Sequence, residues 1–397
     1  MLTSWFVSLP NQMRATAPLL KDMNERTVLE AIRVGAPISR AEISRRAGVS
    51  KPTVSLALQA LLEAGLVREA DGEPGRPSYG AVFFEPVAEA ALVLGIDVGA
   101  RFVRGALCDL HGTVRARHDL ERADAGADAA LSQIAGLHAA LIEAAGLPGE
   151  RVDGVVVGIP GVVNVDTGRL ELADNVPGLG GRAFGAELER RLGLPVQLDN
   201  DINLAALGER WRGVARGVDD FAFLSIGTGL GAGLVLRGEL HRGRHGAAGE
   251  VDYVAAGGAG DIDPCAAAVS AFAARLAAEP GAATALAPPF DVPGVFAAAR
   301  GGDPVGRAVV AEEARRIALH IVPIAAVADV GLVVLGGGVS ASGDLLLAPV
   351  RELLAGWLPY PPRVEVSSLG EAAVLTGALS VGVRRALDSV FVNRARP

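Results

Sequence analysis

Cysteine and lysine are scarce in this chain of 397 residues. Its two cysteines, Cys108 and Cys265, lie far apart and outside any CxxC pair, which excludes a disulfide framework and a zinc site built from cysteines. Lys21 and Lys51 are the only lysines, so almost every basic side chain is an arginine. Together with the abundant alanine and glycine this is typical of a GC-rich genome, so the arginine content by itself indicates no function.

Long apolar runs and an overall basic charge are also absent. No run of about 18 apolar residues occurs, and the N-terminus lacks a basic start followed by an apolar core. We therefore expect a soluble, cytoplasmic protein without membrane contact. The formal net charge is −8, so any surface that binds nucleic acid must be local. A chain of this length with 50% hydrophobic residues is expected to form two or three domains.

Residues 21–85 carry the pattern of a winged helix-turn-helix. Residues 1–20 show no periodicity and are predicted to be a poorly ordered leader. A capping box at Ser39–Glu42 begins the second of three predicted helices, and the short turn 48–50 leads into the third. The inward stripe of the third helix is predicted to consist of Val54, Leu58, Leu61 and Leu62. Residues 66–68 and 79–84 flank a Gly/Pro turn and are predicted to form the hairpin of the wing.

This region is predicted to bind DNA, because the helix spacing, the wing and a local basic cluster agree. Hydroxyl, amide and cationic side chains suit base edges and phosphates, Leu56 suits a thymine methyl group, and an arginine in the wing suits the minor groove. The alternatives are a purely structural three-helix module and, for Arg76, an ordinary turn arginine. The candidate DNA contacts are Arg40, Ser50, Lys51, Thr53, Ser55, Leu56, Gln59 and Arg76.

The stretch Gln197–Trp211 reads as a strand, a polar turn and a helix. Asp199, Asn200 and Asp201 follow the strand directly, at the carboxyl end where open α/β sheets bind ligands. Short polar side chains can also cap the new helix, which is the alternative interpretation. Capping accounts for one of the three residues and leaves the other two for a ligand.

Glycine-rich turns lie between predicted strands at 97–101 and at 227–233, and a third, at 336–338, follows a predicted strand and precedes a predicted helix. The turn 227–233 is not a dinucleotide-binding motif, because a strand rather than a helix is predicted to follow it. A glycine hairpin can offer backbone N–H groups to a phosphate, or it can simply be a tight turn that needs positive φ angles.

Two glycine hairpins, the Asp-Asn-Asp turn between them and a late strand-GGG-helix resemble the sugar-kinase and actin-like ATPase fold. More specifically, the chain resembles the ROK family of repressors and sugar kinases. The matching stretches are GIDVGARFVRGAL (95–107), GIPGVVNVDTGRLELADNVPGL (158–179), LDNDINLAALGER (198–210), SIGTGLGAGLVLRGELHRGRHGAAGEVDY (225–253) and VVLGGGVS (333–340). The resemblance implies an α/β protein with a winged helix-turn-helix ahead of two lobes. Lobe 1 would comprise 86–200 and a C-terminal helix at about 375–397, and lobe 2 would comprise 201–374.

The family also implies a site between the lobes. Asp201 matches the base of the family's kinases, and Asn175, Asn200 and Glu250 match residues that hold sugar hydroxyls. Carboxylates and amides satisfy such hydroxyls in pairs. The resemblance assigns the vestigial phosphate or nucleotide contacts to Asp97, Gly99, Gly227, Thr228, Gly229, Gly336 and Gly337.

Several positions depart from the family pattern. The first phosphate loop has Ala100 and Arg101 where kinases have glycine and threonine, and Asp252 replaces a histidine that binds zinc and sugar. The cysteine-rich zinc motif keeps only Cys265, and a sugar-binding glutamate aligns with Ala267. We therefore expect no bound zinc, no ATP and no catalytic residue, with Asp252 retained as a candidate sugar contact. His241 and His245 lack a partner cluster and are interpreted as surface residues.

Three functions remain open. The first is a sugar-responsive transcription regulator, a repressor of carbohydrate genes, that binds a roughly palindromic operator as a homodimer or homotetramer. The second is an ATP-dependent sugar kinase. The third is an oligomeric DNA-binding protein that no longer binds any sugar.

Overall fold

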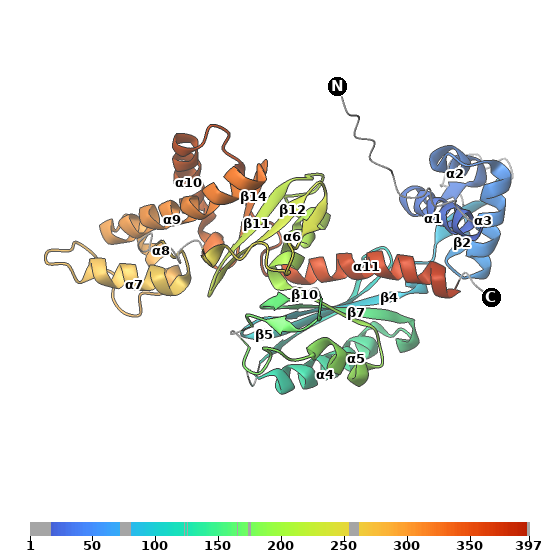
Figure 1. Cartoon of the computed structure of the whole chain (residues 1–397), viewed down its shortest axis with the longest axis horizontal. Coiled ribbons are helices and arrows are strands. Elements are labelled where there is room, and N and C mark those ends of the chain that lie inside the picture. Colours follow the sequence, from blue (N-terminus) through green and yellow to red (C-terminus); the bar gives the residue numbers. More distant parts are fainter. Residues whose placement is uncertain are drawn as a thin grey trace, which may run out of the picture. The chain divides into compact units, whose positions relative to one another are not determined.

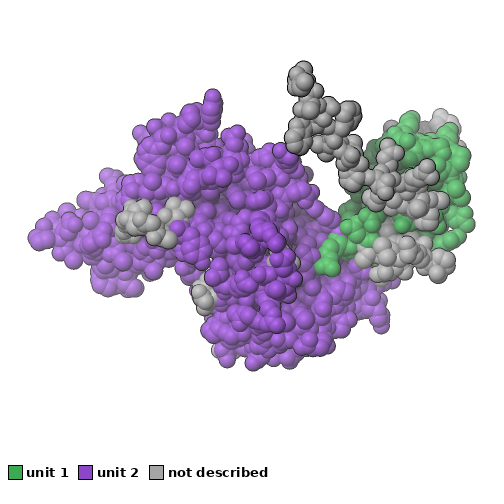
Figure 2. All heavy atoms as spheres, in the orientation of Figure 1, with its two compact units in different colours: residues 1–91, 109–111, 385–397 green, residues 92–108, 112–384 purple. Residues whose placement is uncertain are grey.

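The computed structural model describes residues 17–394 except 72–80, 123, 125, 165, 174–175 and 254–261. These residues form two compact units (Figure 2). Unit 1 contains the described residues up to Ala91, with Asp109–His111 and the last turns of the C-terminal helix from Arg385. Unit 2 contains Leu92–Cys108 and Gly112–Arg384. No helix among the described residues is long and apolar enough to cross a membrane.

Unit 1 is a winged helix-turn-helix, as predicted. Ser39 caps α2 by accepting the backbone N–H of Glu42, and Ser50 caps α3 by accepting the N–H of Thr53. A small sheet of order β1-β3-β2 closes the unit. The elements are α1 (Ala17–Gly35), β1 (Ile38–Ser39), α2 (Arg40–Ala47), α3 (Lys51–Glu63), β2 (Val67–Ala70) and β3 (Phe83–Pro86).

Three details of unit 1 differ from the sequence prediction. Helix α1 begins at Ala17, inside the expected leader, and Pro18 falls in its first turn, where proline is tolerated. Ala57 is buried in the stripe of α3 while Leu62 is 36% exposed, because positions 54, 57, 58 and 61 share one face of the helix. The second wing strand runs over Phe83–Pro86, not 79–84, and the turn with Arg76 lies outside the described residues.

The first sheet of unit 2 has the order β10-β7-β4-β5-β6 (Figure 1). Strands β4, β7 and β10 run parallel, and every residue of β4 is buried, which explains its nearly continuous apolar sequence. The elements of this lobe are β4 (Leu92–Val98), β5 (Phe102–Asp109), β6 (Val114–Glu121), α4 (Ala127–Ala145), β7 (Val152–Ile159), β8 (Val162–Val163), β9 (Leu170–Glu171), α5 (Phe184–Leu192) and β10 (Val196–Asn200).

The second sheet has the order β13-β12-β11-β14-β15. Strand β12 begins at Leu230, so the glycine turn is shorter than the predicted 227–233. Gly233 lies within this strand because α6 packs there: a Cβ would be 2.8 Å from the carbonyl oxygen of Ile202. The elements are α6 (Asp201–Arg212), β11 (Phe221–Ile226), β12 (Leu230–Leu236), β13 (Glu239–His241), α7 (Ala266–Ala277), α8 (Val292–Arg300), α9 (Pro304–Ala328), β14 (Leu332–Gly336), α10 (Gly343–Trp357), β15 (Arg363–Val366) and α11 (Ala373–Arg394).

Helices α6 and α11 cross at very short distance. A Cβ on Gly377 of α11 would lie 1.7 Å from the carbonyl oxygen of Leu204, and one on Gly208 of α6 would lie 2.3 Å from that of Ala373. Glycine on both helices therefore lets the two backbones touch. This crossing fixes α6, which follows the first sheet, against α11, and so sets the position of Asp201 at the start of α6.

Candidate functional site

A cavity of about 260 Å³ opens in unit 2 at the carboxyl ends of the central strands. Four residues that the sequence predicted for this site line it together: Asp97, Gly99, Asp201 and Gly337. They meet because β4, β7 and β10 are parallel, so that Asp97 and Asp199 both stand in register with Gly158 of the strand between them. The chain then turns directly into α6, which carries Asp201.

Burial raises the pKa values of Asp97, Asp201 and Glu250, and for Asp97 and Glu250 the nearby Asp201 adds to the shift. Burial raises the pKa of Asp97 to about 7; the nearby Asp201 adds to the shift and Arg104 opposes it. Asp201 is partly accessible to water, yet desolvation raises its pKa to about 6 against the backbone N–H that it accepts from Ile202. Desolvation is the main cause that raises the pKa of Glu250, and the negative charges of Asp201 and Asp252 add to the shift. Carboxyl groups with raised pKa values can both donate and accept hydrogen bonds, so they suit the hydroxyl groups of a ligand.

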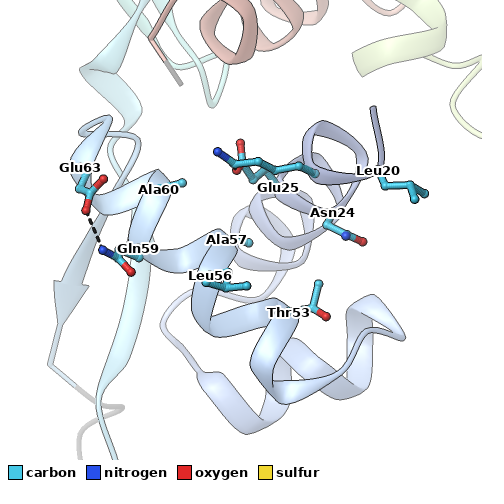
Figure 3. A pocket seen from close by; sticks show the side chains of 10 residues that line it. Leu20, Asn24, Glu25, Thr53, Leu56, Ala57, Gln59, Ala60 and Glu63 are labelled. Carbon is cyan, nitrogen blue, oxygen red and sulfur yellow. Dashed lines mark hydrogen bonds and ion pairs between the residues drawn. The ribbon is translucent and has the colours of Figure 1, made fainter. Parts of the chain in front are cut away.

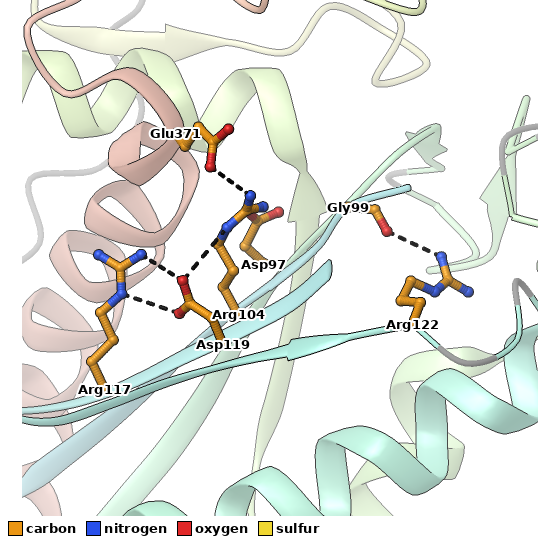
Figure 4. Close-up of polar contacts among 7 residues, drawn as sticks. All are labelled: Asp97, Gly99, Arg104, Arg117, Asp119, Arg122 and Glu371. Atoms are coloured by element: carbon orange, nitrogen blue, oxygen red, sulfur yellow. Dashed lines mark hydrogen bonds and ion pairs between the residues drawn. The ribbon is translucent and has the colours of Figure 1, made fainter. Parts of the chain in front are cut away.

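Arg104 supplies the positive charge of the cleft (Figure 4). This β5 side chain, 13% exposed, donates to Asp97 at 3.4 Å and to Glu371 at 2.8 Å. Asp119, held by Arg117, lies 3.8 Å from its Nε. Arg101, which stands where the family's kinases have threonine, is exposed and is not among the residues that line this cavity. The sequence signal for Arg104 was its place near the start of β5, which follows the turn after Asp97.

Of the predicted glycine-turn residues, Gly227, Thr228, Gly229 and Gly336 are not among the residues that line this cavity. Gly227 closes a tight turn with Gly229 through a backbone hydrogen bond of 3.0 Å, with Thr228 between them. Gly337 has a φ of 79°, and a Cβ there would lie 2.2 Å from the carbonyl oxygen of Ile226. Gly336 packs its Cα against the ring of Phe223. The tight-turn interpretation therefore explains the glycines, and their contact with a phosphate stays a prediction.

The structure brings only some of the predicted sugar contacts close together. Asn200 caps α6 by accepting the N–H of Asn203 at 3.0 Å, and its amide donates to the carbonyl of Gly161 at 2.9 Å. Asn200, and not Asp201, is thus the capping residue, which leaves the Asp201 carboxyl free of that role. Asp252 is exposed and close enough to shift Glu250, whereas Asn175 lies outside the described residues.

Asp199 forms a contact between the lobes that the sequence did not predict. Its Oδ2 accepts a 2.5 Å hydrogen bond from Arg242, in the loop between β13 and Glu250. Only 5% of the Asp199 side chain is exposed, whereas 40% of the Arg242 side chain is. Arg244 of the same loop lies 3.4 Å from Asp166 of the first lobe. The loop that carries Glu250 is thereby tied to the first lobe.

We expect this ion pair to couple the lobes measurably. In a double-mutant cycle of Asp199→Asn and Arg242→Met, the coupling energy should be about 1–2 kcal/mol, between the values of exposed and buried pairs. Thermal unfolding of the four proteins measures it. The more exposed pair of Arg244 and Asp166 is the control and should give a coupling below about 0.5 kcal/mol. Equal coupling in both cycles would contradict the assignment.

The helix-turn-helix presents two cations without a charged partner in the part of the chain that the structure describes. Arg40 opens α2 and Lys51 opens α3, and both side chains are exposed. Arg45 and Arg46 are instead engaged by Glu42. Among the other predicted DNA contacts, the hydroxyls of Ser50 and Thr53 form a hydrogen bond with each other. Ser55 donates a hydrogen bond to the carbonyl of Lys51, and Gln59 donates one to Glu63. Leu56 is 71% exposed.

No group of three or more histidine, cysteine or acidic residues that could hold a metal ion occurs among the described residues. Cys265 is buried as the N-cap of α7, and burial raises the pKa of its thiol well above the ordinary value, so it stays protonated. Ala267 is exposed in the first turn of that helix. Residues 254–261, which precede it, lie outside the described part, so the loss of zinc stays a prediction.

Fold and cleft together define a class: a winged helix-turn-helix joined to a two-lobed, sugar-kinase-like body. The chain belongs to the ROK family, whose sequence profile matches residues 93–384. The profile of the MarR family matches residues 20–77, over the helix-turn-helix.

Known relatives include both regulators and enzymes. The xylose repressor of Caldicellulosiruptor bescii is 26% identical over 91% of this chain and 96% of its own length. A glucokinase of Halalkalibacterium halodurans is 30% identical over 72% of this chain and 92% of its own. Among solved structures, a ROK family transcriptional regulator homologous to the E. coli MLC protein superposes with a TM-score of 0.79, covering 95% of this chain and 99% of that one at 23% identity. A ROK glucokinase of Streptomyces griseus, bound to glucose and AMPPNP, superposes with a TM-score of 0.63. This match covers 74% of this chain and 100% of that one at 27% identity.

Proposed function

We propose that the chain is a sugar-responsive transcription regulator, a repressor of carbohydrate genes, that binds duplex DNA in the cytoplasm. The observation that carries this proposal is that the starts of α2 and α3 expose Arg40 and Lys51, which are free to meet phosphates. Relatives named as xylose repressors that match 91% of the chain support it. Binding as a dimer or tetramer would require a roughly palindromic operator, with half-sites about one or more helical turns apart.

The effector cleft would hold a sugar at Asn200, Asp201, Glu250 and Asp252, and also at Asn175. Carboxylates with raised pKa values match sugar hydroxyls, which both donate and accept hydrogen bonds. A sugar can shift DNA affinity only if it binds the free and DNA-bound states differently. The loop held by Arg242 and Asp199 would pass that difference between the lobes.

The role of Arg40 and Lys51 can be tested directly by electrophoretic mobility shift on duplexes from the chain's own genomic neighbourhood. Arg40→Ala combined with Lys51→Ala should weaken binding by roughly 30–100-fold and lower the slope of log affinity against log salt by about 2. Arg300→Ala removes an exposed cation of unit 2 that pairs with Asp344, and should leave binding unchanged. Equal loss in all variants, or no duplex bound by the native chain, would overturn the proposal.

A sugar panel added to the same assay tests the sensor. Xylose, glucose and N-acetylglucosamine should include at least one sugar that changes operator affinity, and Asp201→Ala should abolish the change. If no sugar on a broad panel alters binding, the sensor part fails and a ligand-independent DNA-binding protein remains.

An ATP-dependent sugar kinase is the second candidate, favoured by glucokinase relatives and by Asp97 and Asp201 in one cavity. Arg104 argues against it, because its guanidinium lies 3.4 Å from Asp97, a residue that the family resemblance assigns to phosphate or nucleotide contacts. We expect no ADP release with any sugar on the panel. Turnover that disappears in Asp201→Ala would reverse this ranking.

A further inference from the structure

A second cavity, of about 620 Å³, lies within unit 1 between α1 and α3 (Figure 3). Its volume falls in the range of small-molecule sites. Apolar walls come from Leu20 of α1 and from Leu56, Ala57 and Ala60 of α3. Leu20 is 48% and Leu56 71% exposed, so both helices present apolar surface to an open space. Large apolar side chains gathered around a cavity mark a place where a ligand or partner removes them from water.

Glu25 gives this cavity a chemical preference. The residue is only 2% exposed, yet its Oε1 accepts no hydrogen bond. The nearest counter-charge is the Nζ of Lys21 at 3.7 Å, on a side chain that is 62% exposed. A buried carboxylate with so weak a partner costs free energy unless a cation or donor satisfies it. Desolvation accordingly raises the pKa of Glu25.

The charges of the lining decide which occupant fits. Two carboxylates, Glu25 and Glu63, face one ammonium group, Lys21, so the cavity has a formal charge of −1. Such a lining disfavours organic anions. It attracts a cation whose apolar part can contact Leu20 and Leu56.

We propose that this cavity binds a small amphipathic organic cation, of the arylalkylamine class, with its ammonium group on Glu25. One ammonium N–H would donate to Oε1, and the ring would cover the apolar walls. Because Thr53, Leu56 and Gln59 both line the cavity and belong to the predicted DNA-reading surface, an occupied cavity would compete with the duplex. Only this regulatory consequence rests on the proposed function; the binding itself does not.

Calorimetry on the full chain tests the binding with two probes of one skeleton, 4-phenylbutylamine and 4-phenylbutan-1-ol. The amine should bind once per chain and at least about tenfold more tightly than the alcohol. Glu25→Gln should remove this preference. Glu30→Gln, the same change at an exposed residue of α1 that pairs with Arg33, should preserve it. Equal affinity of the two probes, or an unchanged preference in Glu25→Gln, would overturn the proposal.

A space-filling variant gives an independent readout. Ala60→Phe places a ring in the cavity and should weaken amine and alcohol alike, whether or not Glu25→Gln folds. Undiminished amine binding in a folded Ala60→Phe protein would place the ligand elsewhere and refute the site. In the mobility shift assay the amine should weaken duplex binding of the native chain and not of Glu25→Gln. A chain that binds the amine but no duplex would contradict the proposed function alone.

Discussion

Replacing Gly377 by alanine is expected to destabilise unit 2 by about 3–5 kcal/mol, the range of severe core substitutions. The new Cβ would lie 1.7 Å from the carbonyl oxygen and 2.5 Å from the carbonyl carbon of Leu204. Both atoms belong to the backbone of α6, so no side chain can rotate to make room. The helices would have to separate, and the cleft residue Asp201 at the start of α6 would move with them.

Thermal unfolding measures this effect, and Gly136→Ala is its matched control. Gly136 is exposed in the middle of α4, and a Cβ there meets no heavy atom within 4 Å. Alanine at this position should stabilise the protein by about 0.5–1 kcal/mol, because alanine favours a helix more than glycine does. If Gly377→Ala behaved like the control, the close crossing of α6 and α11 would be wrong.

Replacing Asp97 by asparagine is expected to stabilise the protein by about 2–4 kcal/mol at pH 8 and by little at pH 4. Burial raises the pKa of Asp97 to about 7 in the folded protein, against an unfolded value near 4. The contribution of this group to stability is therefore complete below about pH 4 and lost as the pH rises through about 7. Asparagine removes the penalty, and Arg104 keeps Glu371 as a partner.

Urea unfolding between pH 4 and pH 8 checks this sign. Asp119→Asn is the control with the opposite expectation, because hydrogen bonding to Arg117 lowers the pKa of Asp119. Its loss should cost less than about 1 kcal/mol at pH 8, since the side chain is 35% exposed, and nothing at low pH. A stabilisation by Asp97→Asn that does not vary with pH would show that the cleft does not hold Asp97 in its protonated form.

The local elements of this protein were predictable because each follows from neighbouring residues. Ser39 and Ser50 cap their helices as the sequence indicated, and the apolar spacing of α3 fixed all but one member of its buried face. The carboxyl end of β10 pointed to a ligand site, and Asp201 does line a cavity. The DNA and sugar contacts themselves stay predictions that the binding experiments address.

Contacts between segments far apart in the sequence were not predictable in this way. Arg104 meets Glu371 only because β5 and the turn before α11 share one cleft, and Arg242 reaches Asp199 only across the lobes. In the sequence, Gly208 and Gly377 are only residues that destabilise a helix. The crossing of α6 and α11 shows why glycine is needed at both positions. Glu25, one acid among several on α1, became distinctive when α3 buried it beside a cavity.

Sequence alone therefore determined the winged helix-turn-helix, because caps, periodicity and turn residues act within a few positions of one another. The two-lobed body and the family followed from the resemblance of the glycine turns and the Asp-Asn-Asp turn to the ROK family. Tertiary structure decided which charges meet, which are buried without a partner and where two backbones touch. Those properties depend on distances through space and on exclusion of water, and neither is encoded in the spacing of residues along the chain.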